Sequence, residues 1–341
     1  MSLRVEELTG SRKRKGERRP REGYYGRPAV KASPWNWMVA SYIFVAGLAG
    51  GAQLLAGAAG LVDRRRFAGP IRNARLLALG GSVAGVGLLI ADLRTPQRWY
   101  NMLRIVRPTS PMSLGTYILS GFGGFTALTA LGPLFGRRNP TVRRVADAAQ
   151  IPAAVTGAGA ATYTAALLAA TSTPAWAAAP RELAVSFGTS SVASAAAALS
   201  AGEALAGRES TRRRLDDVAA VATAAHLAAG WATAQRRRRR GALEGPSETR
   251  PARRVEAADL LLGGILPLGL YAADRATGRR SPWLSVAAAV CVLAGSAALR
   301  QSTLDLGKAS TREPETYLGF TRPRAAHRLG RHPARGPRRP A

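Results

Sequence analysis

Charged and apolar residues occupy separate stretches of this 341-residue chain. Eight stretches contain no Lys, Arg, Asp or Glu, namely 32–62, 76–91, 108–136, 148–180, 183–202, 218–235, 260–273 and 281–299. A helix that crosses a bilayer needs about 20 mostly apolar residues, with roughly 17 to 25 tolerated. Because most of the stretches meet that length, the pattern predicts an all-α, polytopic membrane helix bundle.

Two of these stretches are short for a membrane span. Residues 76–91 reach spanning length only with Asp92 and Leu93, and residues 260–273 need 257–259 at their start. We therefore expect eight spanning helices in two four-helix bundles, or seven if the 260–273 helix is only partly inserted. The stretches are rich in Ala and Gly, which let helices pack closely in lipid, although a GC-rich genome would favour the same residues.

The formal net charge of +29 first suggests a nucleic-acid-binding protein. All 49 Lys and Arg residues, however, lie outside the eight stretches, in the tails and loops. We expect them to set topology, contact membrane lipid or dock an acidic partner, and we expect no nucleic acid partner. The chain then divides into a basic N-terminal extension (1–33), a transmembrane bundle (34–304) and a basic C-terminal tail (305–341), the two extensions having little structure of their own.

Eight spans place both termini on one side of the membrane. Lys and Arg are more numerous on that side, mainly because of the tails and the run 236–240. By the positive-inside rule, the termini are then cytosolic in a multi-pass protein of the inner (cytoplasmic) cell membrane. Tryptophans near the span ends are expected in interfacial belts; they are Trp35, Trp37, Trp99, Trp176 and Trp283.

Cysteine and histidine are scarce. The single Cys291 excludes a disulfide framework and a thiolate metal cluster. Three His residues, two of them in the C-terminal tail, leave little for a metal or haem site. We expect no haem or metal in this chain.

The most specific stretch is 92–117, DLRTPQRWYNMLRIVRPTSPMSLGTY. It follows the end of a span, and Thr95, followed by proline, is predicted to begin a short amphipathic helix in the membrane interface. Pro108 should end that helix, because the residue before a proline is pushed out of the helical region. Ser110 or Ser113 should then begin the next span.

This stretch resembles the NrfD/PsrC family, the integral membrane subunits of polysulfide-reductase-like complexes. Residues 35–51, WNWMVASYIFVAGLAGG, resemble the first helix of that family. Residues 163–176, YTAALLAATSTPAW, resemble its Tyr-Thr-Gly…Pro-x-Trp segment, with Ala165 where glycine is usual, and 24–28, YYGRP, also recurs in members. The resemblance covers about residues 24 to 310.

The resemblance implies a membrane anchor that interacts with quinone or quinol (menaquinone or ubiquinone) in a multi-subunit oxidoreductase. Electrons would pass between an iron–sulfur (ferredoxin-like) subunit and the quinone pool, with a molybdopterin catalytic subunit as a further partner. A membrane transporter and a purely structural anchor are the alternatives. A transporter should show internal repeats and broken helices; Pro152 and Pro267 are candidates for helix breaks, but no convincing repeat is present.

Three residues are candidates for proton transfer. Asp92 is the first, since a carboxylate at membrane depth is costly and tends to mark a proton path; the alternative is a helix-end carboxylate paired with Arg94 or Arg98. Glu203 and His226 are further candidates.

Each of these two further candidates has a structural alternative. Arg208 lies close enough along the chain to pair with Glu203 at the membrane interface. For His226 the alternative is a hydrogen bond to a neighbouring helix.

The candidate quinone-binding residues are Trp37, Tyr42, Arg98 and Tyr163. Tyr42 stands where polysulfide-reductase-like members carry a His near the quinone. A phenol can donate to a quinone carbonyl but is a poorer proton relay than an imidazole. Packing in the bundle is the alternative for both tyrosines, and contact with a lipid phosphate or a partner is the alternative for Arg98.

Overall fold

The computed structural model describes residues 30–104, 106–136, 139–242, 250–278, 281–312 and 314–321, without the side chains of 250–253, 255, 314 and 315. These residues form helices joined by short connections, and no β-strand occurs among them. The YYGRP segment (24–28) and nearly all of the N-terminal extension lie outside the described residues, as does the C-terminal tail beyond Thr321.

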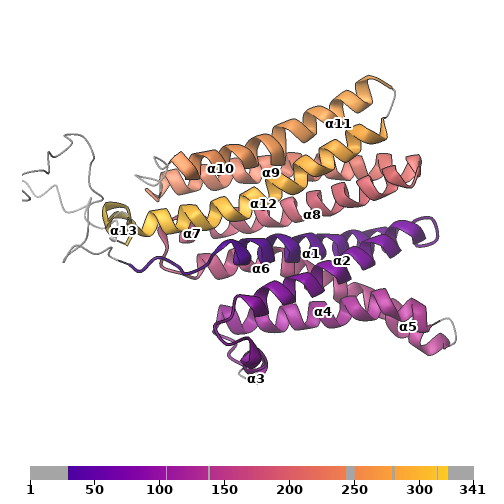
Figure 1. The fold of residues 1–341 in the computed structure, drawn as a ribbon, viewed down its shortest axis with the longest axis horizontal. Helices are drawn as coiled ribbons and strands as arrows, with labels where there is room; N and C mark the ends of the chain where they lie inside the picture. Colours follow the sequence, from indigo (N-terminus) through magenta and orange to yellow (C-terminus); the bar gives the residue numbers. More distant parts are fainter. Residues whose placement is uncertain are drawn as a thin grey trace, which may run out of the picture.

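The first half of the chain forms one group of four long helices, which occupies the lower part of Figure 1. They are α1 (Trp37–Asp63), α2 (Ala68–Ala91), α4 (Pro111–Phe135) and α6 (Gln150–Ala169), with α5 (Pro140–Ala148) leading directly into α6. A 3₁₀ turn, η2 (Pro96–Arg98), and the short α3 (Asn101–Arg104) connect α2 to α4.

The second half forms a second group, which packs on the first through α8 and α12 against α1. It contains α8 (Pro180–Leu205), α9 (Glu209–Arg239), the continuous α10 (Arg250–Leu260), π-helical η4 (Leu261–Ile265) and α11 (Leu266–Ala276), and α12 (Pro282–Arg312). Short α7 (Pro174–Ala177) and α13 (Pro314–Thr321) lie at the end of the molecule where α3 also lies (Figure 1). The predicted all-α polytopic membrane bundle is confirmed.

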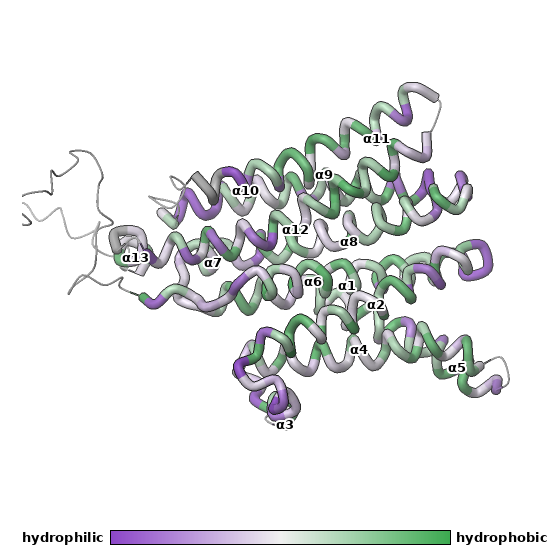
Figure 2. Tube along the Cα trace, in the orientation of Figure 1, coloured by the Kyte–Doolittle hydropathy of each residue, from purple (hydrophilic) through white to green (hydrophobic). Residues whose placement is uncertain are grey.

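Seven of the described helices are long and apolar enough to cross a membrane. They are Trp37–Asp63, Ala68–Ala91, Pro111–Phe135, Pro140–Ala169, Pro180–Leu205, Glu256–Ala276 and Pro282–Arg312. Apolar residues fill the middles of the helices, and hydrophilic residues gather at their ends (Figure 2). The expectation that the 260–273 helix would be the doubtful span is wrong. Helix α9 is long enough but not apolar enough, because Thr223, His226 and Thr233 interrupt its apolar part.

Helix α1 lies at the centre of the molecule because its glycines allow close approach on two sides. A Cβ on Gly50 would lie 2.3 Å from the carbonyl oxygen of Gly157 in α6. A Cβ on Gly51 would lie 2.3 Å from the carbonyl oxygen of Ser191 in α8. The GLAGG segment thus brings α1 into backbone contact with both helix groups, as small residues do in membrane bundles.

The expectation that all basic residues lie in tails and loops is wrong. Among the described residues, four lie buried inside helices: Arg75, Arg212, Arg237 and Arg300. The helices extend beyond the charge-free stretches, so α2 begins at Ala68 and α12 continues to Arg312. The boundary expected at residue 304 therefore falls inside a helix.

Arg300 shows how such a charge is accommodated. Its guanidinium donates to the Ser190 hydroxyl at 2.7 Å and the Ser191 hydroxyl at 3.1 Å, both on α8. The same group lies 4.8 Å from the centre of the Phe187 ring. Because polar groups at membrane depth must find partners within the protein, these hydroxyls replace the water that a surface arginine would have.

Trp176 is predicted to lie in an interfacial belt, but the structure buries it inside the protein. It is among the largest fully buried side chains of the described region. Its indole Nε1 donates to the carbonyl oxygen of Thr303 in α12 at 2.6 Å, and its ring stacks on Trp35 with centroids 5.5 Å apart. A buried indole needs an acceptor for its N–H, and the backbone of α12 supplies it.

Candidate functional site

A cavity of about 340 Å³ lies within the first helix group, at the end where η2 and α3 connect α2 to α4. Its wall is mainly apolar and comes from α1, α2, α4, α6 and the connecting segment. Ligand pockets are typically about 300 to 1,000 Å³, mostly apolar, with a few well-placed polar groups. The cavity fits that description.

Three of the predicted site residues border this one cavity. They come from separate elements: Tyr42 from α1, Asp92 from the end of α2, and Tyr163 from α6. Residues 82, 116, 120 and 164 add serine and threonine hydroxyls to the lining. The fold therefore brings together two phenols and a carboxylate that are far apart in sequence.

The carboxylate of Asp92 is held by the beginning of α1. Asn36 Nδ2 donates to Asp92 Oδ1 at 3.0 Å, while Asn36 Oδ1 accepts the backbone N–H of Met38 at 2.7 Å. The same Asn36 side chain thus both caps α1 and orients Asp92. In the part of the chain that the structure describes, no ion pair joins Asp92 to Arg94 or Arg98, so the paired alternative is absent.

The ring of Tyr163 occupies space that only a glycine leaves free. A Cβ on Gly115 in α4 would lie 1.9 Å from Tyr163 Cζ and 2.1 Å from its hydroxyl oxygen. Gly115 belongs to the specific stretch 92–117. That stretch and the 163–176 segment therefore meet at this contact.

The connection from α2 to α4 is fixed by local hydrogen bonds. Of the two predicted starts of this span, Ser110 is the N-cap of α4. Its hydroxyl accepts the backbone N–H of Ser113 at 3.4 Å. Tyr117 donates to the carbonyl oxygen of Leu103 at 2.9 Å and so holds the connection on α4. Thr95 precedes only a three-residue 3₁₀ turn and makes no capping bond with its side chain.

Two of the predicted quinone-binding residues do not border the cavity. Trp37, the first residue of α1, is 65% exposed, and Arg98 is also exposed. Trp35 and Trp99 line the cavity in their place. Sequence reasoning missed Trp35 and Asn36 as site residues, although Asn is a strong helix N-cap and its position before α1 was a readable signal.

Glu203 lies at the opposite end of the bundle from the cavity, at the end of α8. Its carboxylate accepts two bonds from Arg208, at 2.6 and 2.7 Å, and one from Asn73 at 2.9 Å. The pairing considered as the alternative to a proton relay is the arrangement that the structure shows.

His226 borders a different cavity, in the second helix group. Its Nδ1 lies 3.3 Å from the Ser186 hydroxyl and its Nε2 lies 3.2 Å from Asp259 Oδ1. It therefore bonds neighbouring helices, and it does not meet Asp92 in one site.

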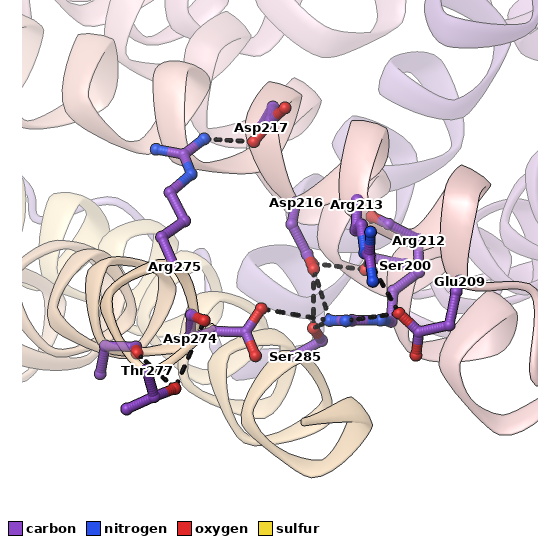
Figure 3. Close-up of polar contacts among 11 residues, drawn as sticks. Ser200, Glu209, Arg212, Arg213, Asp216, Asp217, Asp274, Arg275, Thr277 and Ser285 are labelled. Atoms are coloured by element: carbon purple, nitrogen blue, oxygen red, sulfur yellow. Dashed lines mark hydrogen bonds and ion pairs between the residues drawn. The ribbon is translucent and has the colours of Figure 1, made fainter. Parts of the chain in front are cut away.

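A buried charge cluster at the far end of the second group was not expected from the sequence. Arg212 pairs with Asp216 at 3.0 Å and lies 3.5 Å from Asp274, while Ser285 donates to Asp216 at 2.7 Å (Figure 3). Ser200 adds a bond to Asp216 at 2.5 Å. The cluster ties α8, α9, α11 and α12 together near the membrane surface opposite the Asp92 cavity.

The fold and the cavity define a multi-pass helical membrane protein with a carboxylate and two phenols around one apolar pocket near a membrane surface. Residues 28–229 match the protein-family model described as "Polysulphide reductase, NrfD". Since the match spans more than half of the chain, the protein belongs to the NrfD family, whose members are membrane subunits of oxidoreductase complexes. The resemblance inferred from the sequence is confirmed. No curated protein matches the chain.

Proposed function

We propose that this protein is the membrane anchor and quinone- or quinol-interacting subunit of a multi-subunit oxidoreductase. In this role it passes electrons between an iron–sulfur (ferredoxin-like) subunit and the membrane pool of menaquinone or ubiquinone, with a molybdopterin subunit as the catalytic partner. The observation that carries the proposal is the cavity bordered by Tyr42, Asp92 and Tyr163.

The lining suits a quinone ring, which is flat, apolar on its faces and carries two carbonyl acceptors. The hydroxyls of Tyr42 and Tyr163 are donors of the kind that a carbonyl requires. Large apolar residues at the rim, Val86, Leu103 and Met112, are exposed, as expected where an apolar tail would pass into lipid. The cavity volume of about 340 Å³ accommodates a ring of that size.

The side chains at the cavity divide into those that orient the quinone and those that handle its protons. A quinone supplies two-electron, two-proton redox chemistry when bound. Tyr42 and Tyr163 orient it by donating hydrogen bonds, and the Asp92 carboxylate exchanges the protons. Asn36 keeps that carboxylate directed at the cavity by donating to Oδ1 at 3.0 Å.

The cavity lies at the end of the bundle that carries the basic run 236–240. Arg237, in that run, donates to the carbonyl oxygen of Ala175 in α7, and α7 and α3 lie at the same end (Figure 1). By the positive-inside rule we infer that this end faces the cytosol, with the protein in the inner (cytoplasmic) membrane. The iron–sulfur partner would dock on the same side.

Quinol-linked turnover of the purified complex tests the proposal. We expect Asp92→Asn to lower kcat by about 100-fold, the usual range for loss of an acid–base group. Tyr42→Phe should raise KM for quinone about five-fold, since one hydrogen bond of about 1 kcal/mol is lost.

Two variants serve as matched controls. Tyr271→Phe removes a phenol hydroxyl buried in the second helix group, and Asp217→Asn removes an exposed carboxylate at the far end. Both should keep wild-type kinetics. Unchanged rates in Asp92→Asn and Tyr42→Phe would overturn the assignment of this cavity as the quinone site.

A further inference from the structure

We propose that the cavity of the second helix group binds an anionic phospholipid of the membrane. This cavity of about 580 Å³ is enclosed by α8, α9, α10 and α12. It shares no lining residue with the Asp92 cavity. The proposal is independent of quinone binding.

Arg237 marks the position of the phosphate. It lies in the last turn of α9, is 8% exposed and lines the cavity. Its Nε donates to Ala175 at 2.8 Å, but its Nη2 is buried and finds no acceptor among the described residues. A buried guanidinium N–H without an acceptor is costly, so an anionic oxygen delivered from outside the chain fits this position.

The charge at this end of the cavity is positive. Arg238 lines the cavity beside Arg237 and is exposed, and the run 236–240 continues the positive surface. Glu256 interacts electrostatically with Arg237 and offsets part of its charge. Asp259 is paired with His226, which lies about 16 Å from Arg237 along α9.

The remaining wall suits acyl chains rather than water. Leucines of four helices line it: Leu183, Leu227, Leu260, Leu299 and Leu306. Trp231, which is 68% exposed, lies at its edge, as indoles do at the membrane boundary. Hydrophilic residues gather at this end of α9 and α10 (Figure 2), as expected of helix ends that meet lipid head groups. A free phosphate would leave the leucines without an apolar partner, so the wall favours a lipid.

The test measures binding of phosphatidylglycerol to the purified full chain in nanodiscs, by titration against phosphatidylcholine and by native mass spectrometry. An arginine near a membrane surface contributes about 1 kcal/mol toward anionic lipid. Arg237→Gln and Arg238→Gln should therefore each weaken binding about five-fold. Ala234→Trp, which fills the cavity without changing charge, should abolish retained lipid.

Arg240→Gln is the matched control, because Arg240 is exposed in the same run but does not line the cavity. We expect it to bind as the wild type does. Equal losses in Arg237→Gln and Arg240→Gln would indicate diffuse attraction and overturn the proposal. The proposal would also be overturned if Ala234→Trp bound the lipid as the wild type does. It would likewise be overturned if millimolar inorganic phosphate, added to phosphatidylcholine nanodiscs, competed as effectively as phosphatidylglycerol does. If Arg237→Gln does not fold, Arg238→Gln and Ala234→Trp decide the matter.

Discussion

Asn36 links the start of a helix to the chemistry proposed for the site. Its carbonyl oxygen caps α1 and its amide nitrogen holds Asp92. A single side chain thus connects the start of α1 to a residue 56 positions further along the chain. Serine caps helices nearly as well as asparagine but is too short to replace the amide donor, so the two roles can be separated.

Replacement of Asn36 should separate stability from activity. Asn36→Ser keeps the cap, and we expect the free energy of unfolding to change by less than about 0.5 kcal/mol while kcat falls about ten-fold. Asn36→Ala loses the cap as well, and should cost about 1 kcal/mol of stability in addition. Thermal unfolding and quinol turnover of the same preparations check this. A fall in stability without a fall in turnover would show that Asp92 does not depend on Asn36.

At the scale of helices, glycine decides which elements can touch. Gly50 allows α1 to meet the backbone of α6, whereas Gly60, further along the same helix, has nothing within 4 Å of the position that a Cβ would take. Gly115 and Gly124 make a similar pair on α4. In each pair, an added methyl group should therefore be harmful at the first glycine and tolerated at the second.

On α1, Gly50→Ala should destabilise the protein by about 1 to 3 kcal/mol, because its Cβ would overlap the Gly157 carbonyl oxygen. Gly60→Ala should be neutral or stabilising by up to about 1 kcal/mol, since alanine is the better helix former. Unfolding of both variants in the same lipid is the measurement. Equal stabilities would contradict the close contact of α1 with α6.

On α4, Gly115→Ala should push the ring of Tyr163 out of position and raise KM for quinone about five-fold, while Gly124→Ala leaves KM unchanged. The loss of stability in Gly115→Ala should disappear in a Tyr163→Ala background, because the overlapping ring is then absent. A penalty that persists in that background would mean that Gly115 serves another contact.

Over the whole molecule, the sequence predicted the helices better than their ends. Charges at membrane depth are costly, so charge-free stretches locate the spans. The helices nevertheless continue past those stretches and include buried arginines. These arginines are tolerated because distant helices supply acceptors: Arg75 donates to Gln150 at 2.7 Å, and Arg300 donates to serines of α8. Such pairings depend on packing that a single sequence does not reveal.

The candidate site was predictable in the same partial way. The cost of a carboxylate at membrane depth points to Asp92, the family resemblance points to Tyr42 and Tyr163, and the fold places all three around one cavity. The sequence predicts Trp37 as a site residue, whereas Trp35 is the tryptophan of this segment that lines the cavity. Trp35 precedes the first turn of α1, where helical periodicity no longer fixes the direction of a side chain.

The position of bound quinone tests the central claim most directly. A photoreactive quinone analogue, applied to the purified complex and mapped by mass spectrometry, should label peptides within 35–46, 81–103, 112–122 and 163–168, which contain the cavity lining. An excess of natural quinone should prevent this labelling. Labelling confined to the second cavity, within 226–238 and 256–260, or labelling that natural quinone does not prevent, would contradict the account.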